Sequence, residues 1–137
     1  MQLRPYLNFK GQCEDAFRFY EQHLNAEPGP LFRYEGTALI SQVPADWQNK
    51  IMHGSITVGG QTLMGVDTAP AHYEEPKGFS LMLQFTDASE AERVFDALAK
   101  DGKIILPLEK TFWTERFGML TDQFGIPWMI NCGEEAH

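Results

Sequence analysis

The chain carries the same pattern of segments twice, a short strand, a helix and then three strands. Four apolar residues of the first half, Cys13, Ala16, Phe17 and Tyr20, recur at helical spacing. A shift of 78 positions, the separation of Phe17 and Phe95, places them on Ala91, Val94, Phe95 and Leu98. A repeat of this kind predicts a pseudo-symmetric domain built from two similar modules.

The strands follow from alternation and turn signals. Residues 4–10 and 79–86 alternate apolar and polar side chains before each helix. In the first half we expect a weakly patterned strand over 31–41, a loop over 42–50, and a hairpin of 51–58 with 61–66 joined by Gly59-Gly60. Three apolar runs, 104–108, 117–121 and 128–131, predict consecutive strands of one sheet in the second half.

The second helix carries the clearest boundary signals. Asp87 followed by Glu90 matches a capping box, and Gly102 stands where a left-handed C-cap belongs. We therefore expect one domain over residues 1–137, with module one at 1–67, a linker with Pro70 and Pro76 at 68–77, and module two at 78–132.

Composition excludes several classes of partner. With 19 acidic against 11 basic residues the net charge is −8, so nucleic acid and anionic membrane surfaces are poor partners. No apolar run is long enough to span a bilayer, and the first residues lack a signal-peptide pattern, so a cytoplasmic location is expected. Cys13 and Cys132 are two lone cysteines, which we interpret as small buried apolar side chains.

Three segments resemble the PhnB-like branch of the vicinal oxygen chelate superfamily, which includes glyoxalase I, bleomycin-resistance proteins and extradiol dioxygenases. They are YLNFKGQCEDAFRFY at 6–20, KIMHGSITVGG at 50–60, and PLEKTFWTERFGMLTDQFGIPWMINC at 107–132. The last contains the motif D-x-F-G-x-P-W and is the most specific of the three. The resemblance implies an α+β fold in which two βαβββ modules form a curled mixed sheet around a cavity, with the helices on the outer face.

The resemblance also implies a homodimer, but it implies no particular reaction, because the superfamily spans enzymes and binding proteins. Relatives in this branch are often labelled as a demethylubiquinone methyltransferase. A strand–GxGxG–helix arrangement for S-adenosylmethionine is missing here, since the Gly pair at 59–60 lies at a hairpin.

If the apolar strand faces pack on the helices, the opposite faces line the cavity and form the candidate ligand-binding set. That set comprises Tyr6, Asn8, His53, Ser55, Ser80, Met82, Gln84, Glu109 and Met129. Such a mixture of hydroxyl, amide and imidazole groups suits a small polar ligand. The alternative is that these side chains satisfy one another or face water.

His53 is the sharpest candidate, because it is the histidine that lies within a predicted strand and it is suited to proton transfer near neutral pH. A structural histidine is the alternative. Glu109 could act at the mouth of the pocket or pair with Lys110 or Arg116. Phe112 and Trp113 could clamp a ligand or lie in a dimer interface.

No metal or other cofactor is expected. Metal-using relatives take His, Glu or Gln ligands from the first and last strands of the modules, and the resemblance places Met129 at the position of the last-strand Glu. We therefore favour metal-free binding of a small polar molecule in the cavity. One alternative is a lyase- or isomerase-type enzyme that uses His53 as acid or base with Glu109 or Tyr6 orienting the substrate, and another is a non-catalytic dimeric interaction module.

Overall fold

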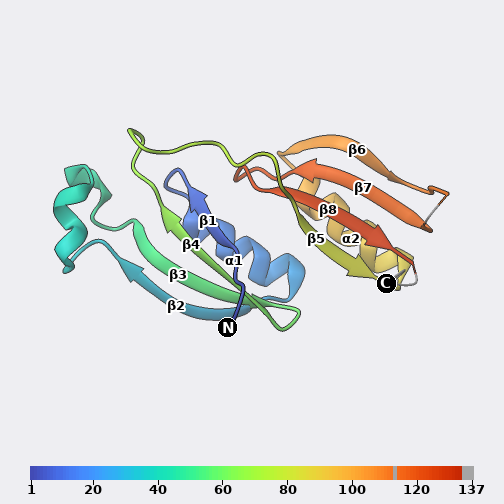
Figure 1. Cartoon of the computed structure of the whole chain (residues 1–137), viewed down its shortest axis with the longest axis horizontal. Coiled ribbons are helices and arrows are strands. Elements are labelled where there is room, and N and C mark those ends of the chain that lie inside the picture. The colour runs from blue at the N-terminus through green and yellow to red at the C-terminus, as the bar shows by residue number, and fades with distance from the viewer. Residues whose placement is uncertain (113, 134–137) are drawn as a thin grey trace. The chain divides into compact units, whose positions relative to one another are not determined.

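The computed structural model describes residues 1–112 and 114–133 (Figure 1). It divides the chain into two compact units, Met1–Glu74 and Glu75–His137, and each unit is described by itself below. Both units contain one helix and a four-stranded mixed sheet. The expected α+β fold of two βαβββ modules is therefore confirmed.

The first unit is a sheet in the order β1-β4-β3-β2 with one helix packed against it. β1 lies parallel to β4, and the other pairings are antiparallel. Its elements are β1 (Tyr6–Phe9), α1 (Cys13–Leu24), β2 (Glu27–Arg33), the 3-10 helices η1 (Ala38–Gln42) and η2 (Ala45–Trp47), β3 (Ile51–Val58) and β4 (Gln61–Asp67).

The second unit repeats this topology with the order β5-β8-β7-β6, and β5 is parallel to β8. Its elements are β5 (Leu81–Phe85), α2 (Ala88–Ala99), β6 (Lys103–Glu109), β7 (Arg116–Thr121) and β8 (Pro127–Cys132). Neither helix of the described chain has the length and apolarity that crossing a membrane requires.

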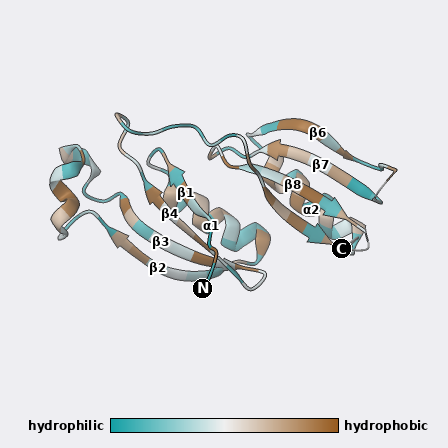
Figure 2. Cartoon of the chain, viewed as in Figure 1, coloured by the Kyte–Doolittle hydropathy of each residue, from teal (hydrophilic) through white to brown (hydrophobic). Residues whose placement is uncertain are grey.

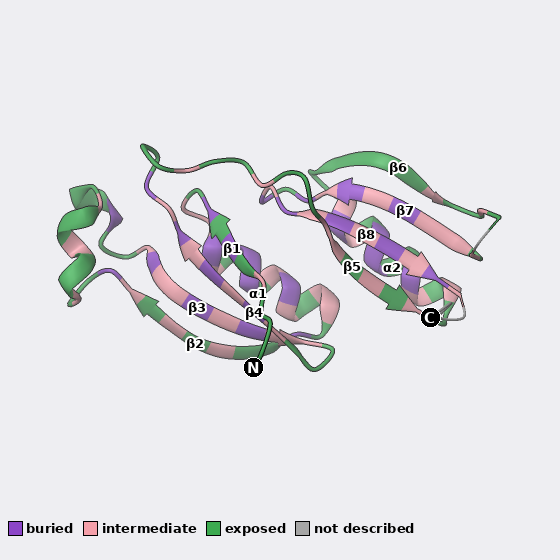
Figure 3. Ribbon diagram, viewed as in Figure 1, coloured by how far each residue is buried: buried purple, intermediate pink, exposed green. Residues whose placement is uncertain are grey.

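Each core lies between a helix and one face of its sheet. The buried residues of α1 are Cys13, Ala16, Phe17 and Tyr20, and those of α2 are Ala91, Val94, Phe95 and Leu98. These are the two sets that the repeat predicted. Most of the strands alternate in hydropathy and burial (Figures 2 and 3), whereas the edge strand β6 is exposed along nearly its whole length. On β8, for example, Trp128 and Ile130 are buried while Met129 is only partly so.

One strand prediction was wrong. The strand expected over 31–41 is β2 at Glu27–Arg33, and residues 38–42 form η1 instead. Pro28 and Pro30 hid this strand in the sequence. They are tolerated because β2 is an edge strand, where a missing backbone N–H costs no ladder bond.

The boundaries of α2 differ in detail from the prediction. Asp87 does cap the helix, but its carboxylate accepts from the Ser89 N–H at 3.0 Å, and Glu90 pairs with Arg93 instead of returning to the cap. The left-handed residue after α2 is Asp101, with φ of 59°, and not Gly102. Gly102 is needed for another reason, since a Cβ there would lie 2.4 Å from the Thr121 carbonyl oxygen.

Two buried carboxylates tie the loops of each unit to its sheet. Asp67 accepts from the Cys13 N–H and the Ile51 N–H, both at 2.8 Å, and so joins the start of α1 to the start of β3. Desolvation nevertheless raises the pKa of Asp67. Asp122 plays a similar part at the β7–β8 turn, where its carboxylate accepts three hydrogen bonds.

Candidate functional site

The face of the first sheet that points away from α1 carries most of the predicted polar residues. The strand register aligns Tyr6 of β1 with Met64 of β4, and Met64 with Ser55 of β3. It also aligns Asn8 with Val66. We call this surface the first open face; it consists of Tyr6, Asn8, Phe32, His53, Ser55, Met64 and Val66.

Tyr6 and His53 form the central contact of the first open face. The Tyr6 hydroxyl lies 3.0 Å from His53 Nδ1, and the ring centroids are 5.7 Å apart. The tyrosine reaches across β4, since its strand and that of His53 are separated by it. Desolvation raises the pKa of Tyr6, so the phenol keeps its proton and can donate to a neutral imidazole. With Nδ1 accepting, neutral His53 carries its own proton on Nε2.

Phe32 and Thr68 are members of this site that the sequence did not indicate. Phe32 is paired with His53 in the register, is 53% exposed, and has its ring centroid 6.5 Å from the imidazole in a stacked arrangement. Asn8 accepts a hydrogen bond of 2.7 Å from the Thr68 hydroxyl. Phe32 lay within the predicted strand over 31–41, but that strand was too weakly patterned to assign its faces, and Thr68 was missed because it follows β4 directly.

The second unit has an equivalent surface with different chemistry. The register aligns Met82, Met129 and Met119 in one row, and Gln84, Asn131 and Phe117 in the next. These six residues are called the second open face. The strand pairing makes this methionine row equivalent to Tyr6, Met64 and Ser55 of the first unit. Met82 and Met119 therefore stand where the first unit has a phenol and a hydroxyl group.

The remaining predicted residues belong to the second unit, and His53 belongs to the first. Ser80 precedes β5 and lies outside any strand, while Glu109 is exposed at the end of β6, in register with Phe117. Arg116, one suggested partner of Glu109, lies 3.6 Å from Glu92 of α2. Phe112 is 97% exposed, and Trp113 lies outside the described residues.

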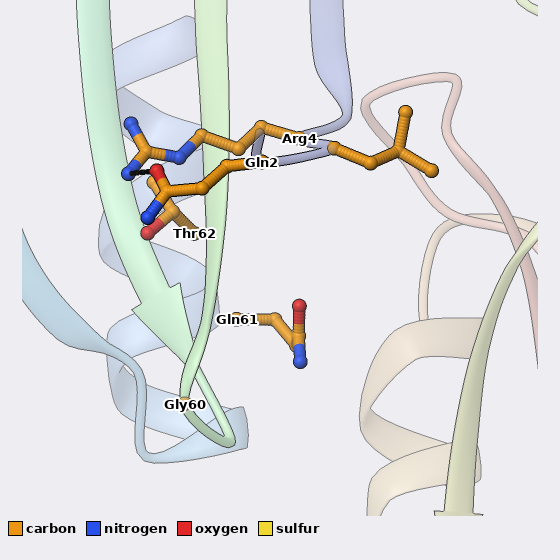
Figure 4. A pocket seen from close by; sticks show the side chains of 6 residues that line it. Gln2, Arg4, Gly60, Gln61 and Thr62 are labelled. Carbon is orange, nitrogen blue, oxygen red and sulfur yellow. Dashed lines mark hydrogen bonds between the residues drawn. The ribbon is translucent and has the colours of Figure 1, made fainter.

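Two hollows in the first unit are lined by other residues. One, of about 230 Å³, is lined by Gln2, Leu3, Arg4, Gly60, Gln61 and Thr62. In Figure 4 the Arg4 and Gln2 side chains run together and are hydrogen-bonded, while Gln61 points away from them. The other, of about 200 Å³, lies at the start of α1, where Arg33 forms a two-pronged ion pair with Glu14. Neither hollow is lined by Tyr6 or His53.

The residues that the resemblance aligns with metal ligands do not suit a transition metal. The first strands offer Tyr6, Asn8, Met82 and Gln84, and the last strand offers Met129. Phenol, amide and thioether groups are weak ligands for Zn, Ni or Fe without imidazole or carboxylate support. Among residues 1–112 and 114–133, no three His, Cys, Asp or Glu side chains are grouped so as to hold an ion. Freedom from metal stays a prediction.

Comparison with known proteins gives close relatives over nearly the full chain. The family model described as 3-demethylubiquinone-9 3-methyltransferase matches residues 1–131. Protein YjdN of Escherichia coli K12 is 35% identical, over 96% of this chain and 95% of that protein. The crystal structure of PA1353 from Pseudomonas aeruginosa is 43% identical with a TM-score of 0.87, over 98% of this chain and 99% of that one.

Two further structures connect the family to its fold. A PhnB protein from Bacillus cereus, titled a putative 3-demethylubiquinone-9 3-methyltransferase, is 25% identical with a TM-score of 0.84, over 97% of this chain and 100% of its own. A glyoxylase/bleomycin resistance protein/dioxygenase domain from Frankia shares the fold at 14% identity, with a TM-score of 0.63, over 100% of this chain and 94% of its own. These relatives establish no specific activity. The chain belongs to the 3-demethylubiquinone-9 3-methyltransferase family, the PhnB-like family that its sequence resembles.

Proposed function

We propose that this protein binds a small polar molecule on the first open face without a metal, and that His53 is its main contact. The observation that carries the proposal is the 3.0 Å hydrogen bond between the Tyr6 hydroxyl and His53 Nδ1. With the Tyr6 hydroxyl as the donor, this bond orients the imidazole and leaves an Nε2–H group free to donate to a ligand. A buried structural histidine would use both nitrogens within the protein, whereas His53 is only partly buried.

The chemistry around His53 favours a ligand that accepts hydrogen bonds and has a flat or apolar part. The Nε2–H group suits a carbonyl or carboxylate oxygen, and the neighbouring Ser55 hydroxyl can donate or accept. Phe32, 53% exposed and stacked near the imidazole, offers an apolar surface beside this donor. Pockets for small molecules combine these two features.

The test is a ligand-detected NMR screen of small carboxylates, amides and ketones against the full chain. Each compound that binds is retested with His53→Ala, and with His72→Ala as a matched control, because His72 is an exposed loop residue. We expect binding to fall at least about tenfold in His53→Ala, the loss of one hydrogen bond to a polar ligand, and to be unchanged in His72→Ala. Equal binding to the wild type and His53→Ala would refute the proposal.

Catalysis by His53 is the second candidate, and the same Tyr6 contact favours it. A hydrogen-bonded phenol can orient an imidazole that removes or returns a proton, as in lyase or isomerase chemistry. The residues that make up the first open face include no carboxylate, thiol or second imidazole, and for that reason we rank binding first. Conversion of a bound compound by the wild type, lost in both His53→Ala and Tyr6→Phe, would favour the enzyme.

We also propose a homodimer, which is the basis of the interaction-module alternative. The edge strand β6 exposes Ile104, Ile105 and Leu106 at 50%, 53% and 41% (Figure 3). Consecutive exposed apolar residues on a sheet edge invite pairing with another chain. Light scattering at micromolar concentration should give twice the 15.6 kDa of one chain, reduced to one chain by Ile105→Lys. A wild-type mass of 15.6 kDa would contradict it.

A further inference from the structure

The second open face contains an amide pair whose orientation is set by the backbone. Gln84 Nε2 donates to the Gly133 carbonyl at 3.1 Å, and a carbonyl can only accept. This fixes Gln84 Oε1 toward Asn131, whose Nδ2 donates to it at 2.7 Å. Flipping either amide would place two donors or two acceptors together. The Asn131 orientation is therefore imposed by its neighbours.

This orientation leaves Asn131 Oδ1 buried without a hydrogen-bond partner. Such acceptors are uncommon in folded proteins, since leaving one unpaired costs free energy. The fold does not require an amide here. The first unit has Val66 at the corresponding register position, where Asn8 pairs with Val66 as Gln84 pairs with Asn131. An apolar residue at this position is thus compatible with the same strand pairing.

The surroundings of Asn131 indicate what would satisfy it. Met129 precedes it by two residues on the same strand face, and Met82 and Met119 flank Met129 in the register. Thioether sulfurs make favourable contacts with aromatic ring edges, and methionine side chains rearrange readily. The methionine row next to Asn131, whose partner on β7 is Phe117, can therefore rearrange to admit an aromatic ring beside Oδ1.

We propose that the second open face binds an aromatic molecule bearing an N–H or O–H group, with the donor at Asn131 Oδ1 and the ring on Met82, Met119 and Met129. This inference rests on the proposed function, that the protein binds a small molecule. It adds a second contact surface with the opposite hydrogen-bond requirement, because His53 offers a donor and Asn131 an acceptor.

The experiment compares two probes that differ by one hydrogen-bond donor. Indole has an N–H group, and 1-methylindole has the same ring system without it. Binding to the full chain, labelled at its methionine methyl groups, is followed by NMR. The chain has six methionines, and Met1 and Met52, which lie outside both open faces, serve as internal controls. We expect indole to shift Met82, Met119 and Met129, and 1-methylindole to bind about tenfold more weakly, the effect of one lost hydrogen bond.

The matched variant is Asn131→Val, which installs the residue of the first unit. Indole should bind it about tenfold more weakly than it binds the wild type, and 1-methylindole should bind both equally. If that variant does not fold, the two probes still test the inference on the wild type. Equal affinity of the probes for the wild type, or no shift at the three methionines, overturns the inference. Neither result affects the His53 screen, whose own failure would refute the proposed function.

Discussion

Replacing Asp122 should cost more stability than any other single substitution of a polar residue in the β7–β8 turn. The Asp122 carboxylate is 3% exposed and accepts from three donors: the Phe124 N–H at 2.9 Å, the Ile126 N–H at 3.0 Å and the Trp128 indole N–H at 2.8 Å. Asp122→Ala leaves all three without their acceptor. At about 1 kcal/mol or more for each unpaired buried donor, the loss is about 3 kcal/mol. That is a large share of the roughly 5–15 kcal/mol that holds a domain folded.

Urea unfolding followed by circular dichroism measures this loss without depending on tryptophan fluorescence. Asp96→Ala, an exposed position on α2, is the matched control and should change the unfolding free energy by less than about 0.5 kcal/mol. Asp122→Asn should lose less than Asp122→Ala, because its amide oxygen can still accept from the Phe124 and Ile126 N–H groups, while its NH₂ group faces the Trp128 indole N–H. In a double-mutant cycle, Trp128→Phe should cost less in the Asp122→Ala background than in the wild type. A loss below about 1 kcal/mol for Asp122→Ala would refute the reasoning.

Three further predictions concern Asp67, His53 and the metal content of the protein. Desolvation raises the pKa of Asp67, so its contribution to stability is full below the ordinary value of 3.8 and is lost as the pH rises through the folded-state pKa. The unfolding free energy of the wild type minus that of Asp67→Asn should therefore fall as pH increases from 3.8, and a rise would contradict it. His53→Ala should cost less than about 1 kcal/mol in urea, because the side chain is partly exposed; a loss of about 1–3 kcal/mol would make His53 structural. Elemental analysis of protein purified without added metal should find well under one Zn, Ni or Fe per chain, and chelator should leave the melting temperature unchanged; stoichiometric metal would contradict this.

The sequence predicted the parts of the fold in which local pattern and tertiary environment agree. β3 runs over the predicted residues because its alternation ends at the Gly59-Gly60 turn, where both residues have positive φ. The buried faces of α1 and α2 were confirmed for the same reason: helical spacing and burial select the same four residues. β2 was misplaced because proline suppresses the local signal of a strand that only its edge position permits.

The site was harder to predict, because its key contacts depend on strand order. Placing Tyr6 on the face opposite the helix required only alternation, but its contact with His53 requires β1 to lie beside β4. The unpaired Asn131 oxygen depends on a carbonyl at Gly133, beyond the strand. Nor did the motif D-x-F-G-x-P-W reveal its physical role, which is the capping of the β7–β8 turn by Asp122 and Trp128. A homodimer, a cytoplasmic location and the arrangement of the modules as one domain stay predictions.

The most direct test of the central claim follows the two ring nitrogens of His53 by NMR while the tightest compound from the screen is added. In the free protein the neutral ring should carry its proton on Nε2, with Nδ1 accepting from Tyr6. On titration the Nε2 resonance should move in step with saturation of the compound, while Nδ1 keeps its contact. A compound that saturates the protein and leaves the His53 Nε2 resonance in place would contradict the proposed site.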